Sequence, residues 1–147
     1  MQLLIRPAEL FDMPQLRAIE QAMFLDGWSE SSIKNELLKP QTMEWVLEHN
    51  DEIAGELLMS VLFDVCEISR LAILPHHRRL GLASNLLGFG LQRAQAAGAE
   101  VARLEVRIDN EPAIALYLAH GFVQDGVRKG YYLDGLDAIL MSKRLEL

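Results

Sequence analysis

Hydrophobic positions along the chain recur with two different periods, which predicts a domain that mixes helices and strands. Apolar residues at helical spacing cover 14–24 and return in a longer stripe that begins at Leu82. Gly98 is well placed to end this second helix. The helix also contains Gly88 and Gly90, each costing about 1 kcal/mol relative to alanine. Close packing against a sheet would be one reason for them.

Runs typical of strands alternate with these helices. Asn50 and Asp51 separate two such runs and indicate a hairpin. A short helix is expected to begin at Ser29 or Ser32, and another covers 110–121. The expected strands are 3–8, 43–49, 53–63, 66–74, 100–108, 122–127 and 137–145. This order predicts one α/β or α+β domain over residues 1–147, with helices on both faces of its sheet.

Composition narrows the class of protein. The chain has 147 residues, of which 50% are hydrophobic and 24% charged, as in a globular domain with a sizeable core. No apolar run reaches the length of a membrane helix, because Glu56 interrupts the best candidate, and the first residues lack the pattern of a signal peptide. A single cysteine, Cys66, excludes an internal disulfide and fits an inert core thiol. A cytoplasmic location without membrane contact is therefore expected.

Charge bears on the choice of partner. The formal net charge of −7, from 14 basic and 21 acidic residues, disfavours nucleic acid, since such binding is driven by neutralisation of phosphates. An acidic surface instead suits cationic partners such as amines or basic peptides. No metal site is predicted, because no cysteine or clustered acid stands at ligand spacing from His76 and His77.

The stretch HHRRLGLAS, residues 76–84, lies between a predicted strand and the long helix. The first turn of a helix presents N–H groups without partners, and the helix dipole adds about half a positive charge there. Gly81 and Ala83 would let a ligand approach the backbone closely, and Arg78 and Arg79 carry planar donors that match phosphate oxygens. The glycines and lysine of a Walker loop or of GxGxxG are missing. The local chemistry therefore fits either a phosphate site or a solvated basic turn.

Several segments together show a family resemblance. Arg78, Gly81 and Ala83 match the Q/R-x-x-G-x-G/A signature of the GNAT acetyltransferases, which bind acetyl-CoA. The segments LAILPHHRRLGLASNLL, LEVRIDNEPAIALYLAHGF and RKGYYLDGLDAILMSKRL resemble the RimI-type branch, the bacterial protein N-terminal acetyltransferases. IRPAELFDMPQLRAIEQAMF and GWSESSI extend the similarity over nearly the whole chain. The resemblance implies the GNAT fold, a mixed and mostly antiparallel sheet flanked by helices on both faces, and it favours the phosphate site.

The resemblance also implies where acetyl-CoA binds. Family members hold the pantetheine arm and acetyl carbonyl with backbone groups of the strand before the loop, and the pyrophosphate with the loop and first helical turn. The matching positions are Leu71, Ala72 and Ile73 in the strand, and Arg78, Arg79, Leu80, Gly81, Leu82, Ala83 and Ser84 in the loop and turn. The family asparagine that contacts the cofactor arm matches Asn110. This residue precedes Glu111 and Pro112 and is also expected to cap a helix.

Acetyl transfer to an amine needs a neutral amine, donors for the developing oxyanion and a proton for the leaving thiolate. At neutral pH an α-amine with a pKa near 8 is about a tenth neutral, whereas a lysine with a pKa near 10.4 is only about 0.04% neutral. A modest base is therefore enough for an α-amine, whereas a lysine needs a much stronger base.

Glu105 is the candidate base and Tyr117 the candidate acid. Glu105 shares the less apolar face of its strand with Arg103 and Arg107, so the pattern fits a base or ordinary cross-strand charge pairs. It matches the glutamate of LEVR that the resemblance implies as base, acting through water. Tyr117 matches the tyrosine of ALY, and with an ordinary pKa near 10 it can protonate a thiolate. Its apolar helix also fits a core aromatic.

Three aromatic residues are expected near the acceptor. Tyr131 and Tyr132 match a family segment near the acceptor site, and Trp28 is expected on the opposite wall; each also fits ordinary packing. Gly27 departs from the proline that often precedes Trp-Ser in the family, which would alter the acceptor loop.

The leading hypothesis is acetyl transfer from acetyl-CoA, without a metal, to the N-terminal α-amine of a protein. By resemblance the acceptor is a ribosomal protein that begins with a small residue such as alanine. The same fold acting on a small amine, such as a polyamine or aminoglycoside, is an alternative. A non-catalytic CoA-binding sensor is another, although a sensor would not need to keep both Glu105 and Tyr117. The sequence does not fix the acceptor or the oligomeric state.

Overall fold

One sheet of seven strands runs through the part of the chain that is described. The structure is a computed structural model, in which residues 3–24, 27–78 and 80–145 are described. The strands are β1 (Leu3–Pro7), β2 (Thr42–His49), β3 (Glu52–Leu62), β4 (Val65–Ile73), β5 (Val101–Arg107), β6 (Val123–Arg128) and β7 (Ala138–Arg144). They lie in the order β1-β2-β3-β4-β5-β7-β6, and all neighbouring pairs are antiparallel except β4 with β5. The predicted mixed and mostly antiparallel sheet is confirmed.

The four α-helices in the described part of the chain lie close to the positions that the sequence predicted, two of them from apolar periodicity. They are α1 (Met13–Met23), α2 (Glu30–Leu37), α3 (Leu82–Ala96) and α4 (Glu111–Ala119), with short 3-10 helices η1 (Leu10–Asp12) and η2 (Pro75–His77). The side chain of Ser29 accepts from the Ser32 backbone N–H at 3.2 Å, and Asn110 Oδ1 accepts from the Ala113 N–H at 3.3 Å. Of the two serines expected to cap α2, Ser29 is the cap, and the cap predicted at Asn110 is confirmed.

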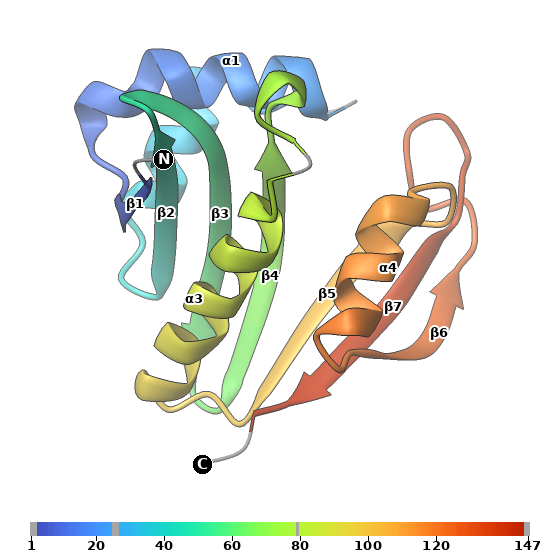
Figure 1. Cartoon of the computed structure of the whole chain (residues 1–147). Helices are drawn as coiled ribbons and strands as arrows, with labels where there is room; N and C mark the ends of the chain where they lie inside the picture. Colours follow the sequence, from blue (N-terminus) through green and yellow to red (C-terminus); the bar gives the residue numbers. More distant parts are fainter. Residues whose placement is uncertain (1–2, 25–26, 79, 146–147) are drawn as a thin grey trace.

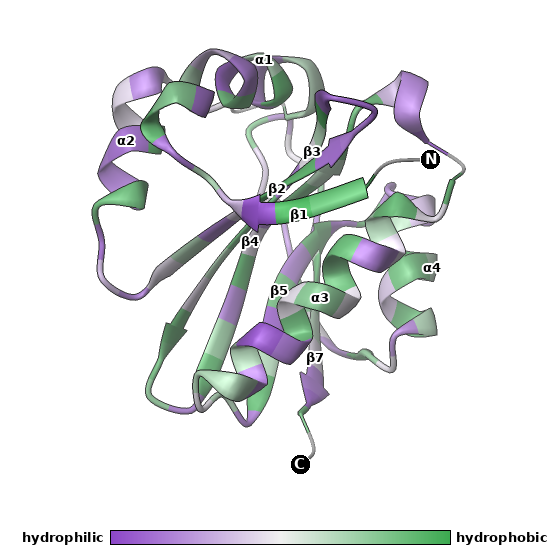
Figure 2. Ribbon diagram, turned by 60° about the vertical axis from the view of Figure 1, so that its left-hand side comes forward, coloured by the Kyte–Doolittle hydropathy of each residue, from purple (hydrophilic) through white to green (hydrophobic). Residues whose placement is uncertain are grey.

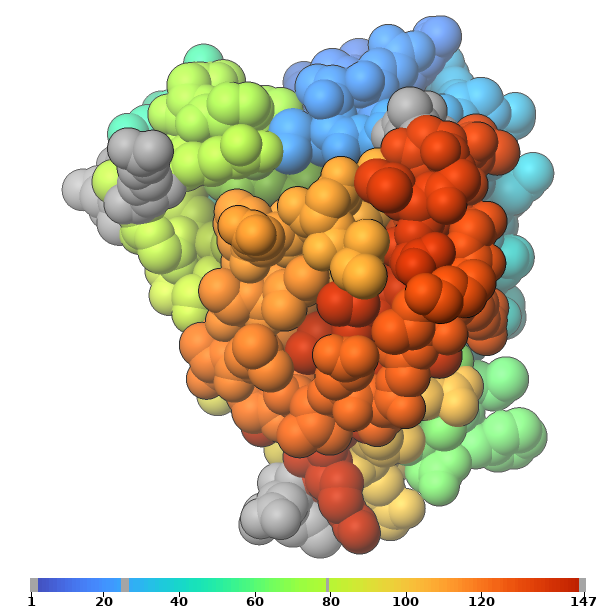
Figure 3. Space-filling view, turned by 90° about the vertical axis from the view of Figure 1, so that its right-hand side faces the viewer, coloured from blue at the N-terminus to red at the C-terminus, as the bar shows by residue number. Residues whose placement is uncertain are grey.

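The helices cover both faces of the sheet, as predicted. Neighbouring residues of β2 point to opposite faces. Val46 packs in a smaller core cluster with Leu16 of α1 and Ile33 of α2, whereas Leu47 packs in a larger cluster with Leu86 of α3. Figure 2 shows α1 and α2 on one side of the strands and α3 and α4 on the other. Figure 3 shows α1 and the segment that follows β4 at the top of the molecule. Below them lie α4, β6 and the segment between β6 and β7.

Close packing explains one of the two glycines inside α3. A Cβ at Gly90 would come within 2.3 Å of the Leu57 side chain on β3, so this position has no room for a larger residue. At Gly88 the nearest atom to such a Cβ belongs to His120 and lies 3.8 Å away, so packing against the sheet does not explain that glycine.

The β2–β3 turn and Cys66 also agree with the sequence prediction. Asn50 and Asp51 have φ values of 52° and 68°, in the left-handed region that a two-residue hairpin turn requires. Cys66 is fully buried, and burial raises the pKa of its thiol to about 12. Within the described ranges, no helix combines the length and apolar character needed to cross a membrane.

β4 and β5 separate partway along their length, and this opening positions the site (Figure 1). Their parallel pairing ends at Ile68 and Leu104. At the same point the register of β4 against β3 shifts, so that Ser69 is an extra residue on β4. A bulge of this kind bends its strand and redirects the side chains that follow. Beyond it, β4 has β3 along one edge and no described strand along the other.

Candidate active site

A cavity of about 540 Å³, the loop cavity, lies between the end of β4, the start of α3 and the start of α4. Most residues predicted to hold the cofactor line it: Leu71, Ala72, Ile73, Arg78, Gly81, Leu82, Ala83, Ser84 and Asn110. Leu80 is exposed and is not among the lining residues. Arg79 lies outside the described residues. The fold thus brings the strand, loop and helix positions of the prediction together around one space.

The start of α3 presents backbone donors to the loop cavity. Its N-cap residue is Gly81, with φ 74°, and no side chain caps the first turn. That conformation lies in the left-handed region favoured by glycine. Uncapped N–H groups and the positive end of the helix dipole together suit an anion. The geometry therefore fits a phosphate site better than a solvated basic turn.

Two polar side chains of the loop cavity already have protein partners. Arg78 Nε donates to the carbonyl oxygen of Ile73 at 3.2 Å, which ties the loop to the end of β4. Ser84 Oγ lies 2.9 Å from His120 Nε2. Burial lowers the pKa of His120, and Lys143 lowers it further. Because these side chains are already engaged, the loop offers a ligand mainly its backbone N–H groups.

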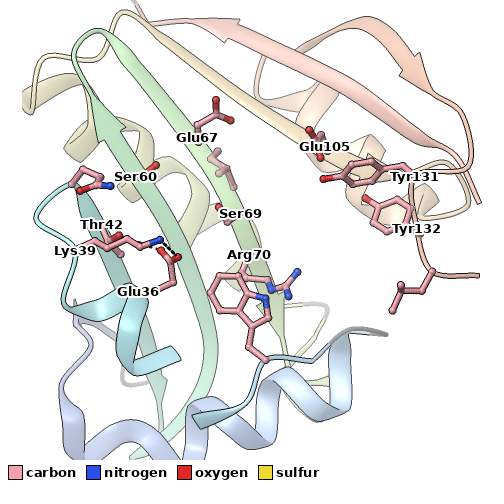
Figure 4. Close-up of a pocket in the computed structure, with 14 residues that line it drawn as sticks. Glu36, Lys39, Thr42, Ser60, Glu67, Ser69, Arg70, Glu105, Tyr131 and Tyr132 are labelled. Atoms are coloured by element: carbon pink, nitrogen blue, oxygen red, sulfur yellow. Dashed lines mark hydrogen bonds and ion pairs between the residues drawn. The ribbon is translucent and has the colours of Figure 1, made fainter. Parts of the chain in front are cut away.

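A larger cavity of about 760 Å³, the polar groove, lies at the opening between β4 and β5 (Figure 4). Figure 4 shows Glu105, Tyr131 and Tyr132 on one wall, and Glu36, Lys39 and Arg70 on the other. Its remaining lining residues are Trp28, Gln41, Thr42, Ser60, Glu67, Ile68, Ser69 and Leu133. The groove thus includes all three aromatic residues predicted near the acceptor, Trp28, Tyr131 and Tyr132.

Most charged side chains of the polar groove are held in ion pairs. Lys39 Nζ lies 2.5 Å from Glu36 Oε1, and Glu67 pairs with Arg103 across β4 and β5. Glu105 Oε1 lies 3.3 Å from Arg128 Nη1, and its side chain remains 31% exposed. Glu105 is thus ion-paired and also faces the groove, so both interpretations of this residue stay open.

A third cavity, the junction, has a volume of about 140 Å³ and shares lining residues with both larger cavities. Leu71, Asn110 and Tyr117 line the junction and the loop cavity, whereas Glu105 and Tyr132 line the junction and the polar groove. The candidate base and the candidate acid thus border the same small space. Sequence alone could not show this, because it depends on the separation of β4 from β5.

Tyr117 is both a core residue and a lining residue. Its exposed fraction is 7%, and its ring packs edge-on against Phe122 with centroids 5.5 Å apart. Burial raises the pKa of Tyr117 above its ordinary value, and Tyr132 adds to the effect. The hydroxyl therefore keeps its proton at neutral pH, as a general acid must.

A buried cluster of glutamates beneath Trp28 was missed by the sequence analysis. The glutamates Glu20, Glu44 and Glu56 have exposed fractions of 1%, 8% and 2%. Glu20 Oε1 accepts from the backbone N–H of Trp28 at 3.1 Å and from Arg70 Nε at 3.2 Å. The Arg70 guanidinium also lies 4.7 Å from the centre of the Trp28 ring. The cluster thus holds Trp28 at the polar groove.

The pKa values of this cluster are shifted upward. Burial, with the nearby Glu20 charge, raises the pKa of Glu44 to about 8. Burial and a hydrogen bond with Glu20 raise the pKa of Glu56 well above its ordinary value. The one signal in the sequence was Glu56 itself, the single acid in the apolar run 53–63.

Gly27 has a packing reason for its departure from the family pattern. A Cβ at this position would lie 2.6 Å from the backbone oxygen of Glu20 in α1. Proline, or any other residue, would therefore push this loop away from α1. The loop that carries Trp28 approaches α1 closely because residue 27 has no side chain.

Comparison with known proteins agrees with this geometry. A family model described as Acetyltransferase (GNAT) family matches residues 13–122. The ribosomal protein bS18-alanine N-acetyltransferase of Escherichia coli is 31% identical over 141 residues, which cover 94% of this chain and 95% of that protein. A Bacillus subtilis protein that carries the same name in provisional form is 32% identical over 139 residues, covering 93% and 92%.

Solved structures agree as well. The crystal structure of the ribosomal-protein-S18-alanine N-acetyltransferase from Escherichia coli matches with a TM-score of 0.91 and 30% identity, covering 99% of this chain and 96% of that one. The family model spans most of the chain, including the signature loop, α3 and the start of α4. This chain therefore belongs to the acetyltransferase (GNAT) family.

Proposed function

We propose that this chain transfers the acetyl group of acetyl-CoA to the N-terminal α-amine of a protein, and that this protein is a ribosomal protein beginning with alanine. One observation carries the proposal: Glu105 and Tyr117 both line the junction, between an anion-binding loop and a polar groove. The acceptor comes from the names of two relatives, at 31% and 32% identity over nearly the whole chain.

The loop cavity fits acetyl-CoA. The uncapped first turn of α3, from Leu82 to Ser84, would hold the pyrophosphate through backbone N–H groups. The free edge of β4 over Leu71–Ile73 would pair with the amides of the pantetheine arm, as an added strand does. Asn110 would use its amide nitrogen for the arm, because its Oδ1 is engaged in capping α4.

The chemistry would take place in the junction. Acetyl-CoA supplies the acetyl group as a thioester with a thiolate leaving group. Glu105 takes the proton of the α-amine, directly or through water, as the amine nitrogen bonds to the carbonyl carbon. Tyr117 gives its proton to the sulfur when the C–S bond breaks. Glu105 then releases its proton to solvent, and Tyr117 recovers one from solvent. The products are an amide and CoA with a free thiol.

The environment of Glu105 suits an α-amine better than a lysine. Its carboxylate is partly exposed to the groove and forms an ion pair with Arg128. An α-amine, about a tenth neutral at neutral pH, needs only modest help. Trp28, Tyr131 and Tyr132 would line the path of the first acceptor residues.

The test measures the initial rate of CoA thiol release with two peptides. One peptide begins with a free alanine and lacks lysine, and the other is blocked at its N-terminus and carries an internal lysine. We expect turnover with the first peptide and none with the second. Turnover with small amines alone, or with neither peptide in protein that binds acetyl-CoA, would contradict the proposal.

A matched pair of variants tests the base. Glu105→Gln should lower kcat with the alanine peptide by about 100-fold, the lower end of the range for a general base. Glu100→Gln makes the same chemical change just before the other end of β5 and should keep kcat close to that of the native chain. Equal kcat values in the two variants would remove Glu105 from this role.

A further inference from the structure

Residues from two distant parts of the chain form a cluster beside the signature loop. His49 ends β2, Glu52 begins β3, and His76 and His77 belong to η2. The sequence predicted no metal site at His76 and His77, because no cysteine or clustered acid stands at ligand spacing from them. The β2–β3 turn changes this. It places Glu52 Oε2 2.9 Å from His77 Nε2 and 3.5 Å from His76 Nε2.

We propose that Glu52, His76 and His77 form a binding site for a divalent transition-metal ion of the zinc class. One ligand atom from each residue lies within 4.8 Å of the other two. Ligands about 2.0–2.1 Å from a tetrahedral zinc ion lie roughly 3.4 Å apart, so small side-chain rotations bring all three to one ion. Two imidazoles and one carboxylate are a zinc-type set, whereas magnesium and calcium prefer oxygen ligands.

Two ligands of this site are exposed to solvent, and the third is buried. The side chains of His76 and Glu52 are 67% and 64% exposed, so an ion can enter and keep water as a further ligand. His77 is 6% exposed, which fixes the direction of its ring. The site therefore combines one rigid ligand with two adjustable ones.

His49 supplies the outer support that metal-binding histidines use. It is buried, and its Nδ1 lies 2.7 Å from Nδ1 of His77. With an ion on Nε2, neutral His77 carries its proton on Nδ1 and can donate it to His49 Nδ1, which requires His49 to hold its own proton on Nε2, beside the side-chain amide of Asn50. His77 also lines the loop cavity, so a bound ion would tie the β2–β3 turn to the segment that precedes Gly81.

The experiment titrates zinc into the untagged full-length chain after treatment with a chelator, using calorimetry. We expect one ion per chain, and no binding of magnesium under the same conditions. His76→Ala removes an exposed ligand and should weaken zinc binding at least tenfold. Glu52→Gln should do the same, while Asp51→Asn removes a neighbouring acid of the same turn and should leave the affinity unchanged.

A second readout identifies the ligands. Cobalt in place of zinc should give a visible absorption band of tetrahedral type, and His49→Gln should weaken binding about 10- to 100-fold, as losses of outer support do. The absence of zinc binding by the native chain would overturn the proposal. Equal affinities in the native chain, His76→Ala and Glu52→Gln would also overturn it, because the ion would then sit elsewhere. Acetyl transfer need not occur for either result, so the proposed function is tested separately.

Discussion

The loop cavity and the polar groove border the same junction, yet they are built in different ways. The loop cavity comes mainly from one continuous strand–loop–helix segment, and it offers backbone groups, a left-handed glycine and small residues. The polar groove takes side chains from four strands, from α2 and from three connecting segments, and it holds most of its charges in ion pairs. One surface is defined by backbone, the other by side chains.

This difference indicates in which of the two cavities substitutions can change the choice of ligand. Substitutions in the loop cavity matter when they alter the backbone path, so its ligand is insensitive to many side-chain changes. Substitutions in the polar groove alter charge and shape directly. A chain can therefore keep its acetyl donor while it changes its acceptor, and the name of a relative at 31% identity is a better guide to the donor than to the acceptor.

The largest expected effect comes from removing the proton donor at the junction, where the two cavities meet. Tyr117→Phe keeps the ring in the core and removes the proton donor, so the single-turnover rate should fall about 100-fold. The Kd for acetyl-CoA should stay nearly unchanged, because the loop binds through backbone groups. Tyr131→Phe removes a hydroxyl that borders the groove but not the junction, and it should raise the peptide KM without lowering that rate. An unchanged rate in Tyr117→Phe would exclude the acid role.

Two glycines at the ends of α3 test whether the loop cavity binds its ligand through backbone groups. Gly81 and Gly98 flank α3, have φ values of 74° and 101°, and would meet nothing within 4 Å if a Cβ were added. Alanine should therefore cost each site about 1–2 kcal/mol of stability. Gly81→Ala should also weaken acetyl-CoA binding about tenfold, since the close approach of a phosphate needs a bare backbone. Equal acetyl-CoA affinities in Gly81→Ala and Gly98→Ala would contradict the backbone model.

The same contrast explains how much could be predicted from sequence. Periodicity and caps are local signals, so the helices, the strands, Ser29 and Asn110 were predicted correctly. The exposure of Glu105 also followed from strand alternation. The loop cavity was largely predictable because most of its residues are consecutive.

Other features depend on which strands meet and in what register. The bulge at Ser69 and the separation of β4 from β5 arise from a register shift that no local pattern marks. The contact of Glu52 with His77 needs the β2–β3 turn to reach η2. Arg128 reaches Glu105 through the position of β6 beyond β7. These tertiary arrangements determine much of the polar groove and of the histidine cluster.

The smallest expected effect concerns Glu44, in the buried cluster of glutamates beneath Trp28. The pKa of Glu44 is raised to about 8 by burial and by Glu20, so the carboxyl is neutral in the folded chain over a range where it is ionised in the unfolded chain. A raised folded pKa gives stability that is fully present below the unfolded value, near 4.5, and is lost as the pH rises to about 8. The Tm of the native chain should therefore fall over this interval.

Glu44→Gln imitates the neutral carboxyl and cannot ionise, so it should flatten that fall. At about pH 8 its Tm should exceed that of the native chain, and near pH 5 the two should nearly agree, as judged by calorimetry. Glu100→Gln removes an exposed acid and should leave the pH dependence as it is in the native chain. Parallel Tm curves for Glu44→Gln and the native chain would mean that Glu44 is ionised in the fold and stabilised by Arg70. In that case the support of the groove would include the charge of Glu44, in contrast to the loop cavity, which offers mainly backbone groups.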